Sequence, residues 1–338
     1  MNVFDLQTNK EDGFDRVEIS VIIPVYNEEG NIDRFEEELI NPLKMSGKAF
    51  EIITVDDGSK DESWTKLVQL ANKFNNFKAL KHSRNYGMGA AYQSAVNESR
   101  GDKIITFSSD LEIPASYILE VSSKLDEGFD VVNTHRTGRW SENAKSSLLR
   151  KLPSTIANSI IQKIAGIKIK DTGSGLKGFQ SYIIKNFKIY GDMHRFLLAY
   201  STLYTTKIVE IDVEYKDRTF GKSAYGSIFR TFSVFLDLFA LYFLLKFSTK
   251  PFTMMPGRSF GSLGIFSFLV GLGINIYLLV LKIIYLENIG DRPLFIVGVL
   301  MIILGVQLLM TGLLGELMMR TYFESQDKTP YLVVKKVN

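Results

Sequence analysis

Two long runs near the C-terminus contain no charged residue, and they restrict what this chain can fold into more than any other feature. One lies between Arg258 and Lys282, and the other between Arg292 and Glu316, so each holds 23 residues. An α-helix needs roughly 17–25 residues to cross about 30 Å of hydrocarbon. Core helices of soluble proteins rarely continue so far without charge. We therefore predict two transmembrane helices, at about 259–282 and 293–316, within a membrane segment of residues 258–319.

The charges that flank these runs predict their orientation. Basic residues precede the first run and follow the second, whereas the loop between the runs is nearly balanced in charge. The flanking basic residues are Lys246, Lys250, Arg258, Arg320, Lys328, Lys335 and Lys336. The positive-inside rule then places the N-terminal domain and the tail, residues 320–338, in the cytoplasm. The acidic N-terminus lacks the apolar region of a secretory signal. We expect a multi-pass protein of the plasma (inner) membrane with both termini cytoplasmic.

Residues 226–257 contain an apolar segment that Asp237 interrupts, so its uncharged stretches are too short to span a membrane. Arg230, Lys246 and Lys250 flank an aromatic-rich face, which is typical of helices lying in the membrane interface. We predict amphipathic interfacial helices here, and a core helix of the soluble domain is the alternative.

Composition excludes some kinds of chemistry. The chain has no cysteine, which excludes disulfides and cysteine-ligated zinc. Its net charge of +3 is small for its 338 residues, so we expect no nucleic-acid partner.

Residues 1–225 alternate strand-like and helix-like segments. The segments "EISVIIPV", "FEIITVDD", "FKALKHS", "DKIITF" and "FDVVNTH" indicate strands, and several are continuous apolar runs. Between them lie helical patterns, one with Ile32, Phe35, Leu39 and Leu43 on one side. Ser59 and Glu62 have the spacing of a capping box that begins the next helix. The alternation predicts an α/β domain with a mostly parallel sheet and helices on both faces.

Polar clusters follow four of the predicted strands, as "PVYNE", "VDDGS", "HSRNYG" and "SSDLE". In open α/β sheets ligands bind beyond the carboxyl ends of the strands, so these clusters predict a common site. The dinucleotide fingerprint G-x-G-x-x-G is absent, which argues against a nicotinamide-dependent enzyme.

Taken together, "SVIIPVYNEEGNI", "EIITVDDGSKDES", "SRNYGMGAA" and "SSDLEIP" resemble glycosyltransferase family 2, which has the GT-A fold. "DTGSGLKGF", "EIDVEYKDRTFGKSAYG" and the paired C-terminal runs resemble its polyprenyl-phosphate glycosyltransferases. The Q-x-x-R-W motif of processive polysaccharide synthases is absent. The resemblance implies an inverting hexosyltransferase that moves a sugar from a nucleotide diphosphate, UDP being favoured over GDP, to polyprenyl phosphate. The product would donate sugar to cell-envelope glycans or glycoconjugates. We also expect a homo-oligomer.

The segment "FSSDLEIP" is the predicted metal site. The family pattern is D-x-D-L-Q-D-P-P, and here Ser108 replaces the first aspartate, Asp110 is kept and Glu112 replaces the glutamine. Carboxylates suit Mg²⁺ or Mn²⁺, which neutralise a departing diphosphate. We therefore predict that Asp110 and Glu112 bind the cation, with a loop or helix-capping role as the alternative.

The resemblance also implies two binding regions. The predicted nucleotide-binding residues are Pro24, Tyr26, Glu28, Asp56, Asp57, Arg84, Asn85 and Gly87, with Asp56 equally suited to a structural role. The predicted ligands of the acceptor phosphate are Arg136, Arg139, Arg218, Lys222, Ser223 and Tyr225. Arginine binds phosphate through two parallel hydrogen bonds, although surface charges that contact anionic lipid would look the same.

Asp110, Asp171 and Arg218 are the predicted catalytic residues. Asp171 suits an orienting residue, a base or a structural turn, and His194 with Arg195 suits structural support. Two other functions remain open at this point. One is an inactive, membrane-anchored binding module, for which Ser108 argues, and the other is a family-2 transferase with a different acceptor.

Overall fold

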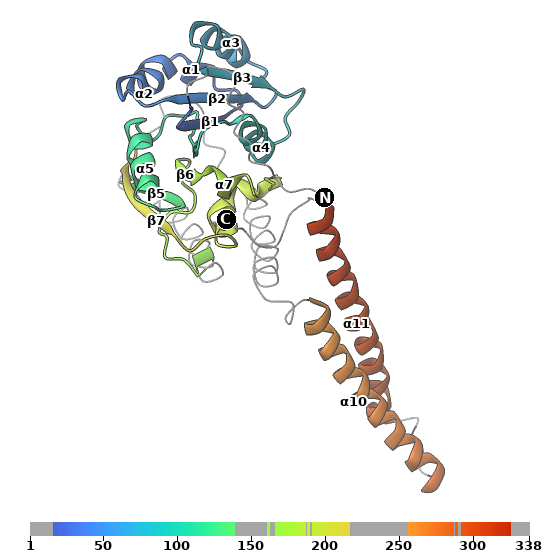
Figure 1. Cartoon of the computed structure of the whole chain (residues 1–338). Helices are drawn as coiled ribbons and strands as arrows, with labels where there is room; N and C mark the ends of the chain where they lie inside the picture. Colours follow the sequence, from blue (N-terminus) through green and yellow to red (C-terminus); the bar gives the residue numbers. More distant parts are fainter. Residues whose placement is uncertain are drawn as a thin grey trace, which may run out of the picture. The chain divides into compact units, whose positions relative to one another are not determined.

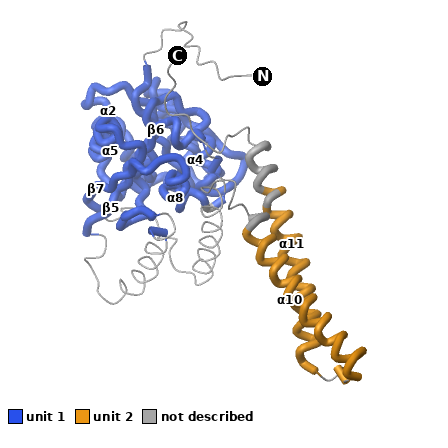
Figure 2. The backbone as a smooth tube through the Cα atoms, turned by 60° about the horizontal axis from the view of Figure 1, so that its bottom comes forward, with its two compact units in different colours: residues 1–238 blue, residues 239–338 orange. Residues whose placement is uncertain are grey.

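The computed structural model describes residues 16–138, 161–162, 166–186, 188–189, 191–216, 256–286, 288–289 and 292–325. The chain forms two compact units, one up to Leu238 and the other from Phe239 onward (Figure 2). The predicted interfacial helices between residues 226 and 255 lie outside the described residues, as do most of the N- and C-terminal tails.

A seven-stranded sheet forms the centre of the first unit, with strand order β3-β2-β1-β4-β6-β5-β7 (Figure 1). The strands are β1 (Ile19–Val25), β2 (Phe50–Asp56), β3 (Phe77–Lys81), β4 (Lys103–Thr106), β5 (Val131–Thr137), β6 (Lys177–Gln180) and β7 (Ile208–Glu214). All neighbouring strands are parallel except that β6 runs antiparallel to β4 and β5. The mostly parallel sheet predicted from the sequence is therefore confirmed.

Helices cover both faces of this sheet. They are α1 (Glu29–Ile32), the π-helical turn η1 (Glu36–Ile40), α2 (Asn41–Met45), α3 (Ser63–Lys73), α4 (Met88–Glu98), α5 (Ser116–Asp126), α7 (Ser181–Ile184), the 3₁₀ turn η2 (Gly191–Phe196) and α8 (Leu197–Ser201). Side chains from α1 to α3 and from α5 share one core with alternate residues of β1, including Val21 and Ile23. Helix α4 packs on β1 and β2 and also contacts η2, which contains His194 and Arg195.

The predicted apolar stripe of the first helical region is buried, although three short helical segments replace a continuous helix. Ile32, Phe35, Leu39 and Leu43 are all at most 1% exposed. The predicted capping box is wrong, because α3 begins at Ser63 and the Glu62 side chain before it makes no capping hydrogen bond. The Ser59 hydroxyl instead accepts a hydrogen bond from the Asn27 backbone N–H at 2.9 Å, so a tertiary contact takes the place of the local one.

The second unit is a pair of long helices, α10 (Pro256–Ile284) and α11 (Pro293–Ser325). Within them, Ser259–Ile284 and Pro293–Gly315 are long and apolar enough to cross a membrane. Only 22% and 11% of their most apolar windows are buried, so most of these side chains face outward rather than into a protein core. This pattern suits lipid as the surroundings.

Glycines allow the two helices to approach closely. A Cβ atom built on Gly271 would lie 2.6 Å from the Gly298 carbonyl oxygen, and one on Gly264 would lie 2.7 Å from the Gly305 carbonyl oxygen. The Ser267 hydroxyl donates a hydrogen bond across the same contact to the Met301 carbonyl at 2.9 Å. Small residues and hydroxyl bonds are the usual means of helix packing in lipid.

Gly271 and Gly273 form a matched test of this packing. Leucine at 271 would overlap the α11 backbone, whereas a Cβ at 273 meets no atom within 4 Å. We expect Gly271→Leu to destabilise the helix pair by about 1–3 kcal/mol, which is typical of overpacking, and Gly273→Leu to be nearly neutral. Melting temperatures of the two variants in detergent measure the difference, and equal values would contradict the close contact.

Candidate active site

Strand direction explains why distant sequence motifs meet at one edge of the sheet. Because β1 to β5 and β7 are parallel, their carboxyl ends share that edge. Strand β6 runs antiparallel to its neighbours, so its first residue lies at this same edge. The loop that precedes β6, residues 170–176, therefore lies there as well. The four predicted polar clusters, the "DTGSG" segment and the chain after β7 therefore converge.

The loops after β1 and β2 are joined by their own side chains. Lys60 donates its backbone N–H to the Asn27 side-chain oxygen at 2.8 Å, and Glu28 donates its backbone N–H to the Ser63 hydroxyl at 2.9 Å. The Glu28 carboxylate in turn accepts a bond from the Asn31 amide at 2.5 Å. Tyr26, just beyond β1, is 42% exposed. Of the predicted nucleotide residues in this loop, Tyr26 thus presents the most accessible surface.

Asp56 and Asp57 differ in the hydrogen-bond partners of their carboxylates. Asp57 is 3% exposed and accepts bonds from the backbone N–H groups of Tyr86 and Gly87 at 2.9 and 2.8 Å. It also pairs with Nδ1 of His82 at 2.7 Å. Asp56 is fully buried, and its Oδ1 accepts the Ser59 N–H at 3.0 Å. Its Oδ2 has no hydrogen-bond partner among the described residues.

The loop after β3 lies against the Asp56–Ser59 turn. A Cβ on Gly58 would lie 2.6 Å from the Arg84 carbonyl carbon, so only glycine permits this contact. The Arg84 guanidinium lies 4.8 Å from the centre of the Tyr86 ring, and both side chains are exposed beside Asn85. Gly87 has a φ of +92°, which favours glycine there.

The predicted metal segment follows β4 and is folded back on itself. Asp110 and Glu112 are 7% and 8% exposed, and Leu111 between them has a φ of +55°. The Glu112 backbone N–H approaches the Asp110 carboxylate at 3.3 Å. The Lys216 backbone N–H donates to the Glu112 carbonyl at 2.8 Å, which joins this loop to the chain after β7.

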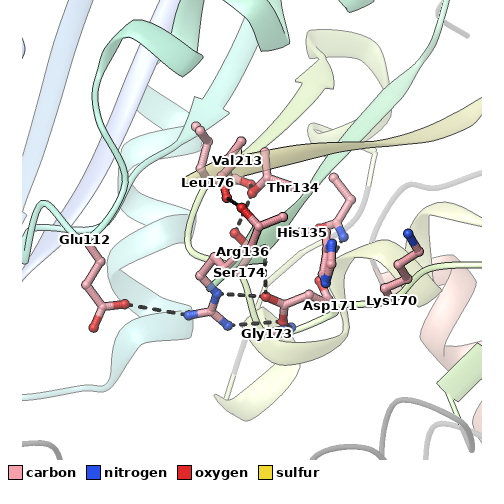
Figure 3. A network of polar contacts seen from close by, with 12 residues as sticks. Glu112, Thr134, His135, Arg136, Lys170, Asp171, Gly173, Ser174, Leu176 and Val213 are labelled. Atoms are coloured by element: carbon pink, nitrogen blue, oxygen red, sulfur yellow. Dashed lines mark hydrogen bonds and ion pairs between the residues drawn. The ribbon is translucent and has the colours of Figure 1, made fainter. Parts of the chain in front are cut away.

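Arg136, at the end of β5, connects two acidic groups from different loops (Figure 3). Its Nε and Nη2 lie 2.7 and 3.1 Å from the two Asp171 oxygens, and its Nη1 lies 3.6 Å from Glu112 Oε2. Arg136 and Asp171 are 7% and 9% exposed. The sequence analysis predicted all three residues for the site but not that they form one buried ion-pair group.

Two further buried residues, one near Asp171 and Arg136 and one near Asp110, were not found from the sequence. Burial lowers the pKa of Lys177 to about 8 from its ordinary 10.5, against the attraction of Asp171 and with a contribution from Arg136. Burial raises the pKa of Tyr92, on α4, and the negative charge of Asp110 raises it further. A lysine beginning a buried strand and a tyrosine among small helical residues were the available signals.

The acidic residues present suit a divalent cation that shares its coordination with a substrate. Within the described part of the chain, no group of three or more histidine, aspartate or glutamate side chains has metal-binding geometry. Mg²⁺ is usually held by one or two carboxylates together with substrate phosphates and water. Asp110 and Glu112, both buried at the strand end, match this smaller set.

Several predicted acceptor residues lie outside the described residues, namely Arg139, Arg218, Lys222, Ser223 and Tyr225. Their roles stay predictions, as do those of the nucleotide and metal residues.

An α/β domain with its polar site at the carboxyl edge, together with two apolar helices, is the architecture of a GT-A glycosyltransferase with a membrane anchor. The glycosyl transferase family 2 model matches residues 20–187. The dodecaprenyl-phosphate galacturonate synthase of Rhizobium johnstonii is 33% identical over 326 residues, covering 95% of this chain and 93% of the relative. The undecaprenyl-phosphate 4-deoxy-4-formamido-L-arabinose transferase of Photorhabdus laumondii subsp. laumondii is 30% identical, covering 94% of both chains.

A crystal structure of glucosyl-3-phosphoglycerate synthase from Mycobacterium tuberculosis shares the fold, with a TM-score of 0.51 at 15% identity over 67% of this chain and 80% of that one. This chain belongs to glycosyl transferase family 2 and is a glycosyltransferase.

Gly175 controls the placement of the metal segment. A Cβ on Gly175 would lie 2.9 Å from the Ser108 Cβ, so alanine there pushes the loop that holds Asp110 and Glu112. We expect Gly175→Ala to reduce sugar transfer by about tenfold or more, because a shift of ~1 Å near reacting groups can cost ~10²-fold. Adding Ser108→Gly should restore most of the activity in steady-state assays, and Ser108→Gly alone is the control. Failure of this rescue would contradict the steric explanation.

The lowered pKa of Lys177 predicts that the free energy of unfolding depends on pH. Between pH 8 and 10.5 the unfolded chain holds a proton that the folded protein has released, so folding becomes more favourable as pH rises. From pH 7.5 to 9.5, wild type should gain about 2 kcal/mol relative to Lys177→Met, measured as the difference between their melting temperatures in detergent. A difference that does not change with pH would show that Lys177 keeps its proton.

Proposed function

We propose that this chain transfers a sugar from a nucleotide diphosphate sugar to polyprenyl phosphate at the membrane. The observation that carries the proposal is the similarity to two polyprenyl-phosphate sugar transferases over almost the whole chain. The alignment with the first covers 95% of this chain, so neither apolar helix can lie wholly outside it. A lipid acceptor also explains why an α/β domain is joined to helices that suit a membrane. The product would serve as a sugar donor for cell-envelope glycans.

The donor side of the proposed site would lie at the carboxyl ends of β1, β2, β3 and β4. We assign Asp56, rather than Asp57, to the base or ribose, since Asp57 is already held by His82 and two backbone N–H groups. The Oδ2 of Asp56 has no partner among the described residues and can accept such a bond, but it is buried, so a ligand would reach it only after the surrounding loop moves. Tyr26, Arg84 and Asn85 would complete the pocket with exposed side chains.

Asp110 and Glu112 would hold Mg²⁺ or Mn²⁺ against the donor diphosphate. When bound, the cation supplies the charge neutralisation that lets the nucleoside diphosphate leave. The chain's own contribution is to fix both carboxylates at the strand end through the turn at Leu111 and the bond from Lys216.

The acceptor would attack without a strong base. A phosphate monoester has a second pKa near ~6, so it is mostly a dianion at pH 7. Its oxygen would form a bond to the anomeric carbon while the bond from that carbon to the diphosphate oxygen breaks, with inversion. We therefore assign Asp171 to orienting Arg136, which it holds with two contacts, rather than to removing a proton. Arg136, Arg139, Arg218 and Lys222 would bind the acceptor phosphate.

We further propose that the active site faces the cytoplasm, as the basic residues flanking the two apolar runs indicate. The homo-oligomer remains a prediction.

A transfer assay tests the function. Purified protein with polyprenyl phosphate and a panel of radiolabelled UDP- and GDP-sugars should give organic-extractable label with one donor, and EDTA should abolish it until Mn²⁺ or Mg²⁺ is returned. Asp110→Asn should lower transfer by about 10²-fold or more, since it removes one of the two carboxylates proposed to hold the cation that neutralises the leaving group. Ser108→Asp, which restores the family residue, should stay active.

Other outcomes would contradict the proposal in different ways. No label with any donor, despite donor binding, would indicate an inactive binding module. Transfer to a water-soluble acceptor alone would indicate a different acceptor. In sealed right-side-out vesicles, the donor should be used only after permeabilisation, and use without it would contradict the cytoplasmic orientation.

A further inference from the structure

One polar residue from each of four neighbouring strands faces the loop that contains Asp171. Thr106 of β4 is paired with Lys177 of β6, Lys177 with Asn133 of β5, and Asn133 with Glu210 of β7. Directly paired residues place their side chains on the same face of a sheet, so these four form a row across it. We call them the polar row.

Each member of the polar row binds the backbone of residues 170–175. The Thr106 hydroxyl donates to the Gly175 carbonyl at 2.9 Å, and Lys177 Nζ donates to the Ser174 carbonyl. The Asn133 amide donates to the Asp171 carbonyl at 2.8 Å. The polar row thus binds the loop through the loop's own peptide groups.

Glu210 makes the largest number of these contacts. Its Oε1 accepts the backbone N–H groups of Lys170 and Asp171, both at 3.1 Å, and its Oε2 accepts the Lys170 N–H at 2.8 Å. Oε1 also accepts the Asn133 amide at 2.8 Å, which fixes the orientation of that buried amide. A carboxylate is suited to this position because both of its oxygens only accept hydrogen bonds.

The hydrogen bonds of the polar row continue through Asp171 to Arg136. Glu210 and Asn133 hold the N–H and carbonyl of Asp171, and the Asp171 side chain then holds the Arg136 guanidinium with two contacts. We propose that Glu210 is a positioning residue for the acceptor side of the active site, acting through Asp171 on Arg136. This inference rests on the proposed function, because it assigns the acceptor phosphate to Arg136.

Glutamine at 210 tests this inference without a change of shape. In Glu210→Gln an NH₂ group replaces one carboxylate oxygen. This hydrogen-bond donor would then face another donor, either a backbone N–H or the Asn133 NH₂ group. We expect Glu210→Gln to raise KM for polyprenyl phosphate or lower kcat by about tenfold or more, while the Kd for the donor stays within twofold. Glu210→Asp, which keeps two acceptor oxygens, should retain more activity than Glu210→Gln despite its shorter side chain.

Glu214→Gln is the matched control, because Glu214 lies on the same strand with an exposed side chain. Amide hydrogen exchange of the peptide covering residues 170–176 gives a readout that does not depend on activity. It should speed up by about tenfold or more in Glu210→Gln and not in Glu214→Gln, since lost hydrogen bonds lower the local free energy of opening.

These results separate the inference from the proposed function. Faster exchange in an enzyme that transfers sugar to no polyprenyl phosphate would leave the positioning role of Glu210 intact and overturn the function. Unchanged exchange and unchanged acceptor kinetics in Glu210→Gln would overturn the positioning role. Equal losses in donor affinity and acceptor kinetics, with a lowered melting temperature, would also overturn it by showing a general structural role.

Discussion

The buried contact of Arg136 with Asp171 and Glu112 is the interaction on which the candidate site depends. All three residues are less than 10% exposed, and they come from β5, the loop before β6 and the loop after β4. Charges buried to this degree lose much of their hydration, and removing one partner of such a group typically costs about 3–5 kcal/mol. The benefit is in geometry, because the guanidinium holds the Asp171 carboxylate through two hydrogen bonds while it lies 3.6 Å from Glu112. The loop after β4 and the loop before β6 are thereby joined through Arg136.

The parts of the fold that could be predicted from sequence are those in which local pattern and burial agree. Strands β1 and β2 were predictable because burial on both faces requires continuous apolar runs, and α10 and α11 because lipid tolerates no charge over such a length. Strand β6 was not predicted. It has four residues, begins with Lys177 and contains Gly178, so only its pairing with β4 and β5 makes it a strand. The capping box failed for the same reason, since the Ser59 hydroxyl is used by a loop 32 residues away.

The candidate site also combines residues that the sequence predicts with contacts that only the folded structure shows. Family-like motifs identified Asp110, Glu112 and Asp171, and Arg136 was predicted as a cation that suits the acceptor phosphate. Spacing alone could not show that residues 35 positions apart form one ion pair. Spacing also could not show that the Asp57 carboxylate, and not that of Asp56, binds backbone N–H groups of the loop after β3. This difference depends on where that loop places those N–H groups. Asn133 and Glu210 gave no signal of their own, because each lies among other polar or charged residues of its strand. Their importance comes from strand order, which places β7 beside β5.

Charge balance then explains why the site needs more than these residues. Asp110, Glu112 and Asp171 contribute three formal negative charges, and Arg136 and Lys177 contribute two formal positive ones, so these five residues have a formal charge of −1. The proposed reaction brings two anions together, a diphosphate donor and a phosphate acceptor, and such a group would repel both. A divalent cation at the carboxylates would reverse the sign on the donor side. The arginines and lysine predicted between residues 139 and 222 would do so on the acceptor side. In the proposed reaction the five described residues would arrange the reacting groups, and the cation with the basic segment would supply the attraction that brings the substrates to them.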